Sequence, residues 1–247
     1  MNELTNGIKI YVEDTKQTYH TLNNWGLALG NNNYISDPVQ ETAYINVPFR
    51  DGMIDISETV SGRPIFKTRE LSFEMGGLNA RRRWDSVVSD LRNKVHGRVC
   101  RLTLDNDLEW YWRGRVYINE FDRERELGTL KIEVPECEPY KYNWQGYAEP
   151  WVWDLFNFET GTTLSKGDID VDGQRTVTIE SGAMLSAPTF TVSNIVGIAT
   201  LTAKGRTYRL KDGRNYFPSL LVGGIDPTEL LFAGAFHVLI DVRSGSL

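Results

Sequence analysis

The chain has 247 residues, of which 40% are hydrophobic, 11% aromatic and 24% charged, a profile typical of folded proteins with one large or two ordinary domains. Its formal net charge of −6 disfavours general nucleic-acid binding, because affinity for phosphate backbones comes mainly from clustered Lys and Arg. The N-terminus lacks a basic region followed by an apolar core, and no apolar run approaches the roughly 20 residues of a membrane span, so we expect neither a secretory signal nor membrane insertion.

One helix is predicted in the N-terminal half, within residues 79–97. Its apolar residues recur at helical spacing and share one face: Trp84, Val87, Val88, Leu91 and Val95. Asn79 is a candidate N-cap, and Gly97 is a candidate residue just past the C-terminus. Three arginines, residues 81–83, lie in the first turn, where the helix dipole disfavours cations. Either a local acidic partner or solvation would account for them, and solvation is favoured.

The segment DNDLEWYWRGRVY, residues 105–117, admits three interpretations: a metal- or acid-bearing loop, an aromatic and basic ligand surface, or a strand with its turn. Residues 99–104 alternate as a strand, and the Asp-Asn-Asp that follows is typical of turns. A second strand over residues 110–117 places the tryptophans on one face and the arginines on the other. Asp105 and Asp107 lack the further oxygen ligands that calcium requires, so we predict a structural hairpin.

Much of the remaining chain is predicted to form short antiparallel strands. Residues 129–134, 176–179 and 189–192 alternate between apolar and polar side chains. Glycine-containing breaks recur between such segments, at Asp172-Gly173, Ser181-Gly182, Lys204-Gly205 and Asp212-Gly213. These patterns predict a mainly β protein: a β-sandwich with one α-helix and a β-hairpin in the N-terminal domain, followed by a second β-sandwich.

A composition shift near residue 140 predicts a domain boundary, with domains at residues 1–140 and 141–247. Prolines and aromatic residues crowd the junction, and the chain beyond it is rich in Thr, Ser and Gly. Tryptophan faces stack on sugar rings, but aromatic side chains also pack domain junctions and subunit interfaces, and the packing role is favoured here. The candidate ligand or interface aromatics are Trp144, Tyr147, Trp151 and Trp153.

The sequence contains no motif that indicates catalysis. It has no phosphate-binding loop, dinucleotide fingerprint or nucleophile elbow, and its 33 acidic residues single out no carboxylate pair. His20, His96 and His237 lie far apart in the sequence. Cys100 and Cys137 are too few for a zinc site, and we expect them to be buried and unpaired. We therefore predict no enzyme and no catalytic, cofactor-binding or metal-binding residues.

Four segments of the N-terminal half occur in an order typical of one known family. They are VPFRDGMIDISETVSGRPIFKTRELSFEM (residues 47–75), the helix containing Trp84, LTLDNDLEWYWRGRV (residues 102–116) and CEPYKY (residues 137–142). Together they resemble the N-terminal domain of the distal tail proteins of long-tailed phages with non-contractile tails. Phe49 stands where that family usually has glycine. SAPTFTVS, RTYRLKDG and FHVLIDVRSGSL are more loosely similar to the galectin-like β-sandwich that follows in the family.

The resemblance implies a structural role in a virion. Distal tail proteins form six-subunit rings at the tail tip (the baseplate) and serve host adsorption and DNA ejection. The ring joins the major tail protein of the tail tube to the tail-associated lysin or tail fibre hub, and in some members it carries receptor-binding proteins. Its central channel passes DNA, and an acidic chain is consistent with a conduit that must not retain a polyanion. The resemblance thus implies a homohexamer made in the host cytoplasm, whose N-terminal domains close the ring by head-to-tail contacts.

A carbohydrate-binding module is the alternative. In that interpretation, the C-terminal sandwich and the aromatic residues between Trp144 and Trp153 would bind host cell-wall polysaccharide. A small wall-degrading enzyme is a third hypothesis, for which the sequence offers no site.

Overall fold

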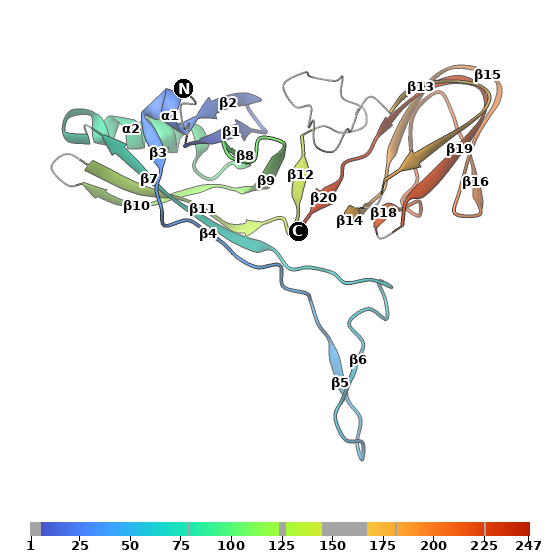
Figure 1. Cartoon of the computed structure of the whole chain (residues 1–247), viewed down its shortest axis with the longest axis horizontal. Helices are drawn as coiled ribbons and strands as arrows, with labels where there is room; N and C mark the ends of the chain where they lie inside the picture. Colours follow the sequence, from blue (N-terminus) through green and yellow to red (C-terminus); the bar gives the residue numbers. More distant parts are fainter. Residues whose placement is uncertain (1–5, 79, 124–126, 145–166, 181, 225) are drawn as a thin grey trace. The chain divides into compact units, whose positions relative to one another are not determined.

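The computed structural model describes residues 6–78, 80–123, 127–144, 167–180, 182–224 and 226–247 of the chain (Figure 1). The chain divides into two compact units, residues 1–139 and 140–247. Both units consist mainly of antiparallel strands, which confirms the predicted fold class. The ring-forming role of the first unit and the galectin-like character of the second stay predictions.

Two antiparallel sheets and two helices form the body of the first unit. One sheet has the order β2 (Gln17–His20), β1 (Ile8–Val12), β8 (Val99–Leu104), β9 (Trp110–Arg115). The other has the order β10 (Tyr117–Arg123), β11 (Leu127–Cys137), β7 (Arg69–Leu78), β3 (Leu27–Leu29), and β4 (Tyr34–Ile35) also pairs with β7. The predicted hairpin is confirmed, because β8 and β9 pair in antiparallel register with Leu102 opposite Trp112.

The predicted helix is confirmed as α2 (Ala80–Val95). Trp84, Val88, Leu91 and Val95 are all buried, and Val87 packs against the same core. Gly97 has a φ of 76°, as expected for a residue just beyond a helix. Asn79 and the side chains of residues 81–83 lie outside the described part of the structure, so their predicted roles stay predictions.

A second helix, α1 (Thr21–Trp25), was not predicted. His20 caps its N-terminus: the backbone there is extended, and the imidazole accepts a hydrogen bond from the amide of Asn23. Gly26, with a φ of 66°, ends the helix. A helix of five residues is too short to leave a 3.6-residue hydrophobic period in the sequence, which is why the pattern missed it.

Between β4 and β7 the chain leaves the body as an extended arm, here residues 37–68 (Figure 1). Near its end β5 (Tyr44–Asn46) and β6 (Met53–Asp55) form a short hairpin, in which Ile45 lies opposite Ile54. The rest of the arm, residues 37–43 and 56–68, forms two stalk segments. They are also paired, through an isolated bridge between Gln40 and Phe66.

The second unit is built on three long strands. Its elements are β12 (Lys141–Asn143), β13 (Asp168–Ile179), β14 (Gly182–Ser186), β15 (Thr189–Ala203), β16 (Arg206–Arg209), β17 (Gly213–Tyr216), β18 (Val222–Gly224), β19 (Thr228–Asp241) and β20 (Gly245–Ser246). Strand β19 lies between β13 and β15, while β16 and β17 pair with opposite ends of β15. Strands β14 and β18 pair with each other, as do β12 and β20.

The long strands fold over, so that each contributes to both layers of a sandwich. In the ladder between β15 and β19, Phe190 lies opposite Ile240 and Phe232 lies opposite Leu201. The ring centroids of Phe190 and Phe232 are nevertheless only 5.9 Å apart, although they belong to different ends of that ladder. All four side chains are buried in a single core. The core of the second unit therefore lies between the two layers that the folded strands form.

Glycines lie at the level where the three strands bend. Gly173 of β13 pairs with Gly234 of β19, and both have positive φ, 83° and 132°. Gly197 of β15 has a φ of 81°. The sequence predicted that Asp172-Gly173 separates two strands, and this prediction is wrong: β13 continues through it, because a glycine with positive φ bends a strand without ending its pairing.

The predicted turn at Lys204-Gly205 is confirmed. Ala203 and Arg206 pair directly, and the two residues between them have φ values of 49° and 73°. Two consecutive positive φ values are typical of a type I′ turn, the connection that matches the twist of a hairpin.

Among the described residues, no helix is long and apolar enough to cross a membrane.

Candidate assembly interface

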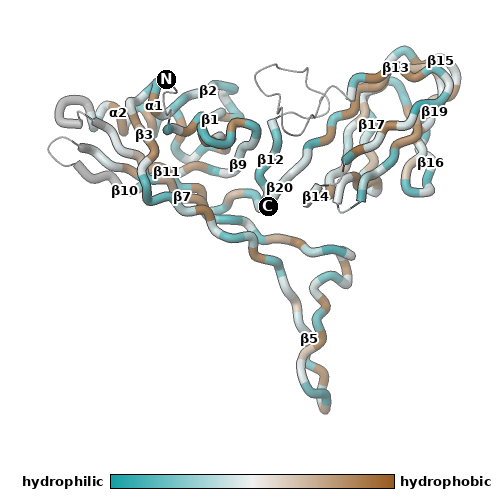
Figure 2. Tube along the Cα trace, in the orientation of Figure 1, coloured by the Kyte–Doolittle hydropathy of each residue, from teal (hydrophilic) through white to brown (hydrophobic). Residues whose placement is uncertain are grey.

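The arm carries most of the exposed apolar side chains of the first unit. Nine large hydrophobic residues are exposed among the described residues of that unit, and only Tyr34 and Leu108 lie outside the arm. The other seven are Val39, Tyr44, Ile45, Phe49, Met53, Val60 and Ile65. Figure 2 shows hydrophobic positions recurring along the arm. Since large exposed apolar surfaces mark sites of association, the arm is the candidate interface.

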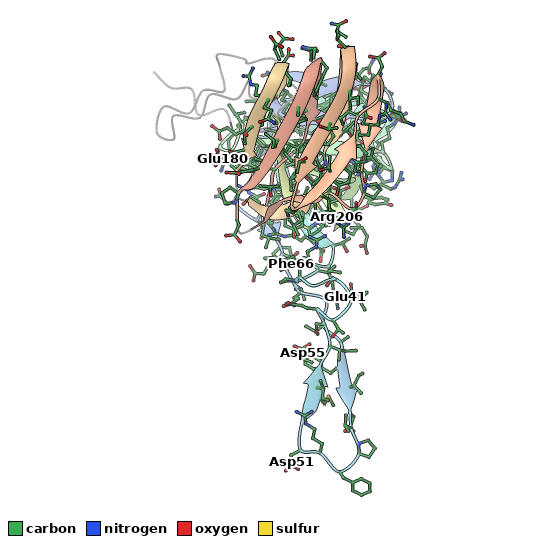
Figure 3. The ribbon with its side chains drawn as sticks, turned by 90° about the vertical axis from the view of Figure 1, so that its right-hand side faces the viewer. Glu41, Asp51, Asp55, Phe66, Glu180 and Arg206 are labelled. Carbon is green, nitrogen blue, oxygen red and sulfur yellow. The ribbon has the colours of Figure 1, made fainter. Side chains whose placement is uncertain are left out.

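Local hydrogen bonds define the path of the arm. The amides of Glu41 and Lys67 donate to the carbonyls of Ile65 and Val39, at 2.7 and 2.9 Å, and join the two stalk segments. Further out, the amide of Ala43 donates to Oγ of Ser57 at 2.8 Å. Figure 3 shows Glu41 and Phe66 on the stalk, Asp55 beyond them and Asp51 at the far end. A lone two-stranded hairpin is only marginally stable in water, so a surface that covers the arm would stabilise it.

Phe49 is the most conspicuous residue of the arm's tip. Its side chain is fully exposed, and its backbone φ of 64° lies in the left-handed region. That conformation costs a non-glycine residue roughly 1–2 kcal/mol. Neither the backbone conformation nor the exposure of the ring helps this chain to fold, which points to a contact with another molecule.

The turn that connects β8 and β9 also makes long-range contacts, through the side chain of Asp105. Oδ2 of Asp105 accepts a hydrogen bond from the amide of Gly7 at 2.8 Å, and Oδ1 lies 2.9 Å from Nε2 of His20. Because Nδ1 of His20 accepts from the amide of Asn23, Nε2 carries the proton and donates to Asp105. The sequence pattern indicates a turn role alone for Asp105, and the structure corrects that interpretation. Its carboxylate connects the hairpin to Gly7, which precedes β1, and to His20, which caps α1.

An ion-pair network lies across the same sheet. Glu13 accepts hydrogen bonds from Nε of Arg101 and Nε of Arg113, both at 2.9 Å. Arg113 also pairs with Glu138. Hydrogen bonding by Arg113 holds the pKa of the Glu13 carboxyl below its ordinary value, and the same contact raises the pKa of Arg113. Arg101 and Arg113 are directly opposed in register, so Glu13 offsets their repulsion.

The other two histidines make separate local contacts, one in each unit. Nδ1 of His96 accepts from the amide of Ile118 at 3.0 Å, beyond the end of α2, and His237 on β19 contacts Asp168 and Asp170 of β13. No group of three or more His, Cys, Asp or Glu side chains in this part of the chain could hold a metal ion.

The two cysteines are buried and unpaired, as expected from the sequence. Burial raises the pKa of both thiols, Cys100 and Cys137, to about 12. Neither is therefore poised as a thiolate nucleophile.

Of the four aromatic residues proposed from the sequence, the structure describes one, Trp144. Trp144 is half-buried at the end of the described segment 127–144. Tyr147, Trp151 and Trp153 lie outside the described residues, so the role of the four aromatic residues stays a prediction. Sequence reasoning missed the arm, although four of its seven exposed apolar residues lie within the family-like segment 47–75, because no helical or strand period marks them.

The fold of the chain is similar to that of a phage protein of known structure. The crystal structure of Dit from phage SPP1, described as a paradigm of the hub adsorption apparatus in phages that infect Gram-positive bacteria, aligns with this chain at a TM-score of 0.55. The alignment covers 96% of this chain and 98% of Dit, at 12% sequence identity, and it establishes a common fold. The predicted likeness to distal tail proteins is thus confirmed for the fold. No family model and no curated protein matches the sequence.

Proposed function

We propose that the protein is a structural subunit of a phage tail-tip hub, situated in the tail of the virion, and not an enzyme. The observation that carries this proposal is the extent of the shared fold, 96% of this chain and 98% of Dit. A match that runs through both units favours a common architecture over a single widespread β-sandwich module. Fold alone does not imply function, so assembly is the property to test.

The proposed assembly is a ring of six copies, closed by the arm. An arm that leaves one copy and buries its apolar side chains on the next makes a head-to-tail contact, which closes into a ring when the same rotation repeats. The seven exposed hydrophobic side chains of the arm support this arrangement. Each aliphatic or aromatic side chain that becomes buried contributes about 1.5–3 kcal/mol before the cost of association.

Further partners follow from the same proposal. The ring would join the major tail protein of the tube to the tail-associated lysin or fibre hub protein, and could carry a receptor-binding protein through the second unit. Its central channel would pass DNA during ejection, and the net charge of −6 suits a wall that does not retain a polyanion. The protein would be made in the host cytoplasm before it joins the virion.

Light scattering after size-exclusion chromatography, with negative-stain images, tests the proposal. We expect the purified chain to form closed rings of six copies. A variant with Ile45→Ser and Met53→Ser on the arm should lose them, because both residues are exposed and apolar. The matched control is Val196→Ser with Ile198→Ser, an exposed apolar pair in the second unit, which should keep the rings. A strict monomer at every concentration would contradict the assembly, and retention of that monomer on glycan affinity gels would favour the carbohydrate-binding alternative.

A further inference from the structure

A buried cation lies at the foot of the arm, the place where residues 36 and 69 connect the arm to the body. Arg69, the first residue of β7, is 7% exposed. Its Nη1 is buried and has no hydrogen-bond partner among the described residues. Burial lowers the pKa of its guanidinium. Burying an incompletely paired charge is costly, and an apolar side chain of similar length would fill the same space at less cost. The presence of an arginine at this point therefore calls for an explanation other than packing.

The backbone ladder that holds the arm to the body ends beside Arg69. Strand β4 pairs with β7 at Tyr34 and Ile35, and the next residue, Ser36, donates its amide to the carbonyl of Glu70 at 2.9 Å. In a regular ladder the amide of Glu70 would donate to the carbonyl of Ser36. Here it donates instead to Oγ of Ser36, at 2.9 Å. That exchange leaves the carbonyl of Ser36 available, and Nε of Arg69 donates to it at 2.8 Å. The side chain of Arg69 thus takes the place of the last backbone hydrogen bond between the two strands.

The same guanidinium also contacts the hairpin of the other sheet. Its central carbon lies 4.7 Å from the ring centroid of Trp112, which is itself buried in the core. Such cation–π contacts are strongest where water is excluded. Arg69, on strand β7, therefore contacts two other parts of the first unit: Ser36, which directly precedes the arm, and Trp112 on the buried face of β9.

We propose that Arg69 is the positioning residue of the arm, and that it sets the direction in which the arm leaves the body. The bonds beyond the foot join the two stalks to each other: the amide of Lys67 donates to the carbonyl of Val39, for example. They do not set the angle between the arm and the body. At the foot itself, Oγ1 of Thr68 donates to Oε2 of Glu136 on β11 at 2.5 Å, which holds the returning side of the arm. Arg69 holds the outgoing side at Ser36. A fixed angle matters because every copy in a closed ring must reach its neighbour by the same rotation. The consequence for assembly rests on the proposed function.

Distances between spin labels on the full-length chain test this role. Labels at Asp51→Cys on the tip and Thr15→Cys on the body, diluted with an excess of unlabelled protein, report the direction of the arm. The native thiols are fully buried and should remain unlabelled. We expect Arg69→Met to broaden the distance distribution and to speed amide exchange at Ser36 and Glu70 about tenfold, the effect of losing one charged hydrogen bond.

The controls separate positioning from stability. Arg69→Met should change the melting temperature little, because removal of an incompletely paired buried charge offsets the loss of the hydrogen bond to Ser36. Lys67→Met removes an exposed cation from the same stalk and should leave the distances unchanged. Arg69→Lys, which keeps the charge but lacks Nε, should broaden the distribution as well and serves if the methionine variant does not fold. A lower melting temperature with an unchanged distance distribution would mean that Arg69 is only structural.

Ring formation in the same variants separates this inference from the proposed function. If wild-type protein forms no rings but Arg69→Met still broadens the distances, the hub proposal fails and the positioning role stands. If wild-type rings form and the Arg69→Met protein forms them at the same concentration with unchanged distances, the positioning role fails and the hub proposal stands.

Discussion

The indole ring of Trp84 lies against the backbone of Gly128. A Cβ atom at Gly128 would stand 2.4 Å from two atoms of that ring, closer than real contacts allow. Gly77, the register partner of Gly128 across β7 and β11, is similarly close: its Cβ would stand 2.9 Å from the same ring. Two paired glycines thus make room for the one tryptophan of α2, and the helix can approach the sheet only because both side chains are absent.

Gly128→Ala should therefore destabilise the protein by about 1–3 kcal/mol, the usual cost of overpacking a core. Thermal or urea unfolding measures the change. Gly76→Ala is the matched control, since it lies beside Gly77 on β7 and its Cβ would meet no atom within 4 Å. Equal effects of the two substitutions would mean that the Trp84 contact does not limit the approach of the helix.

Phe49→Gly should weaken assembly without weakening the monomer. The substitution removes an exposed ring and relieves a left-handed backbone that costs phenylalanine roughly 1–2 kcal/mol. We expect an unchanged or higher melting temperature of the monomer together with a higher concentration for ring formation. Phe49→Ala keeps the backbone cost and removes the ring, so it should assemble as poorly as the glycine variant. Normal assembly of both variants would exclude Phe49 from the interface.

Asp105→Ala should cost about 1–3 kcal/mol, because it leaves the amide of Gly7 and Nε2 of His20 without their acceptor. Asn106→Ala in the same turn has an exposed side chain and should change stability much less. Urea unfolding of both variants gives the comparison. If Asn106→Ala proved as damaging as Asp105→Ala, the turn itself, and not the long-range contacts, would explain the aspartate.

Glu13 should make stability depend on pH. Hydrogen bonding by Arg113 lowers its pKa in the folded protein below the ordinary 4.5. The carboxylate therefore stabilises the fold at a pH above 4.5, and this contribution disappears as the pH falls through the lowered pKa. The stability difference between wild type and Glu13→Gln should shrink over that acid range in urea titrations. A difference independent of pH would show that the charge on Glu13 contributes nothing.

Gly234→Ala should destabilise the second unit specifically. A Cβ at this position would stand 2.5 Å from the carbonyl oxygen of Ile198, and its φ of 132° is unfavourable for alanine. Gly205→Ala provides a comparison: its φ is also positive, 73°, but its Cβ would meet nothing within 4 Å. Hydrogen exchange resolved by region should place the loss in β13, β15 and β19, and an equal loss in the first unit would contradict this account.

Local patterns predicted the regular elements well. The spacing of Trp84, Val88 and Leu91 indicates α2 because a helix has one dominant period. Alternation indicates β8, β9 and β11 for the same reason, with a period of two. The short helix α1 has too few residues to repeat a period, and Gly173 carries the signature of a turn although its strand continues.

The candidate interface was harder to predict than the fold. The arm is a paired stalk without a core, so its apolar residues follow neither period. Arg69 likewise looks like an ordinary charged residue at the start of a strand. Its burial depends on Trp112, which is 43 positions away in the sequence.

The sequence by itself determined the class of this protein: mainly β, with one amphipathic helix and a resemblance to phage distal tail proteins. It could do so because hydrophobic periods and turn residues act over a few neighbouring positions. Only the tertiary structure decided that Asp105 holds His20, that Gly77 and Gly128 admit Trp84, and that Arg69 holds the foot of an exposed arm. These relationships join residues far apart in the chain, and they exist only once the strands are in register.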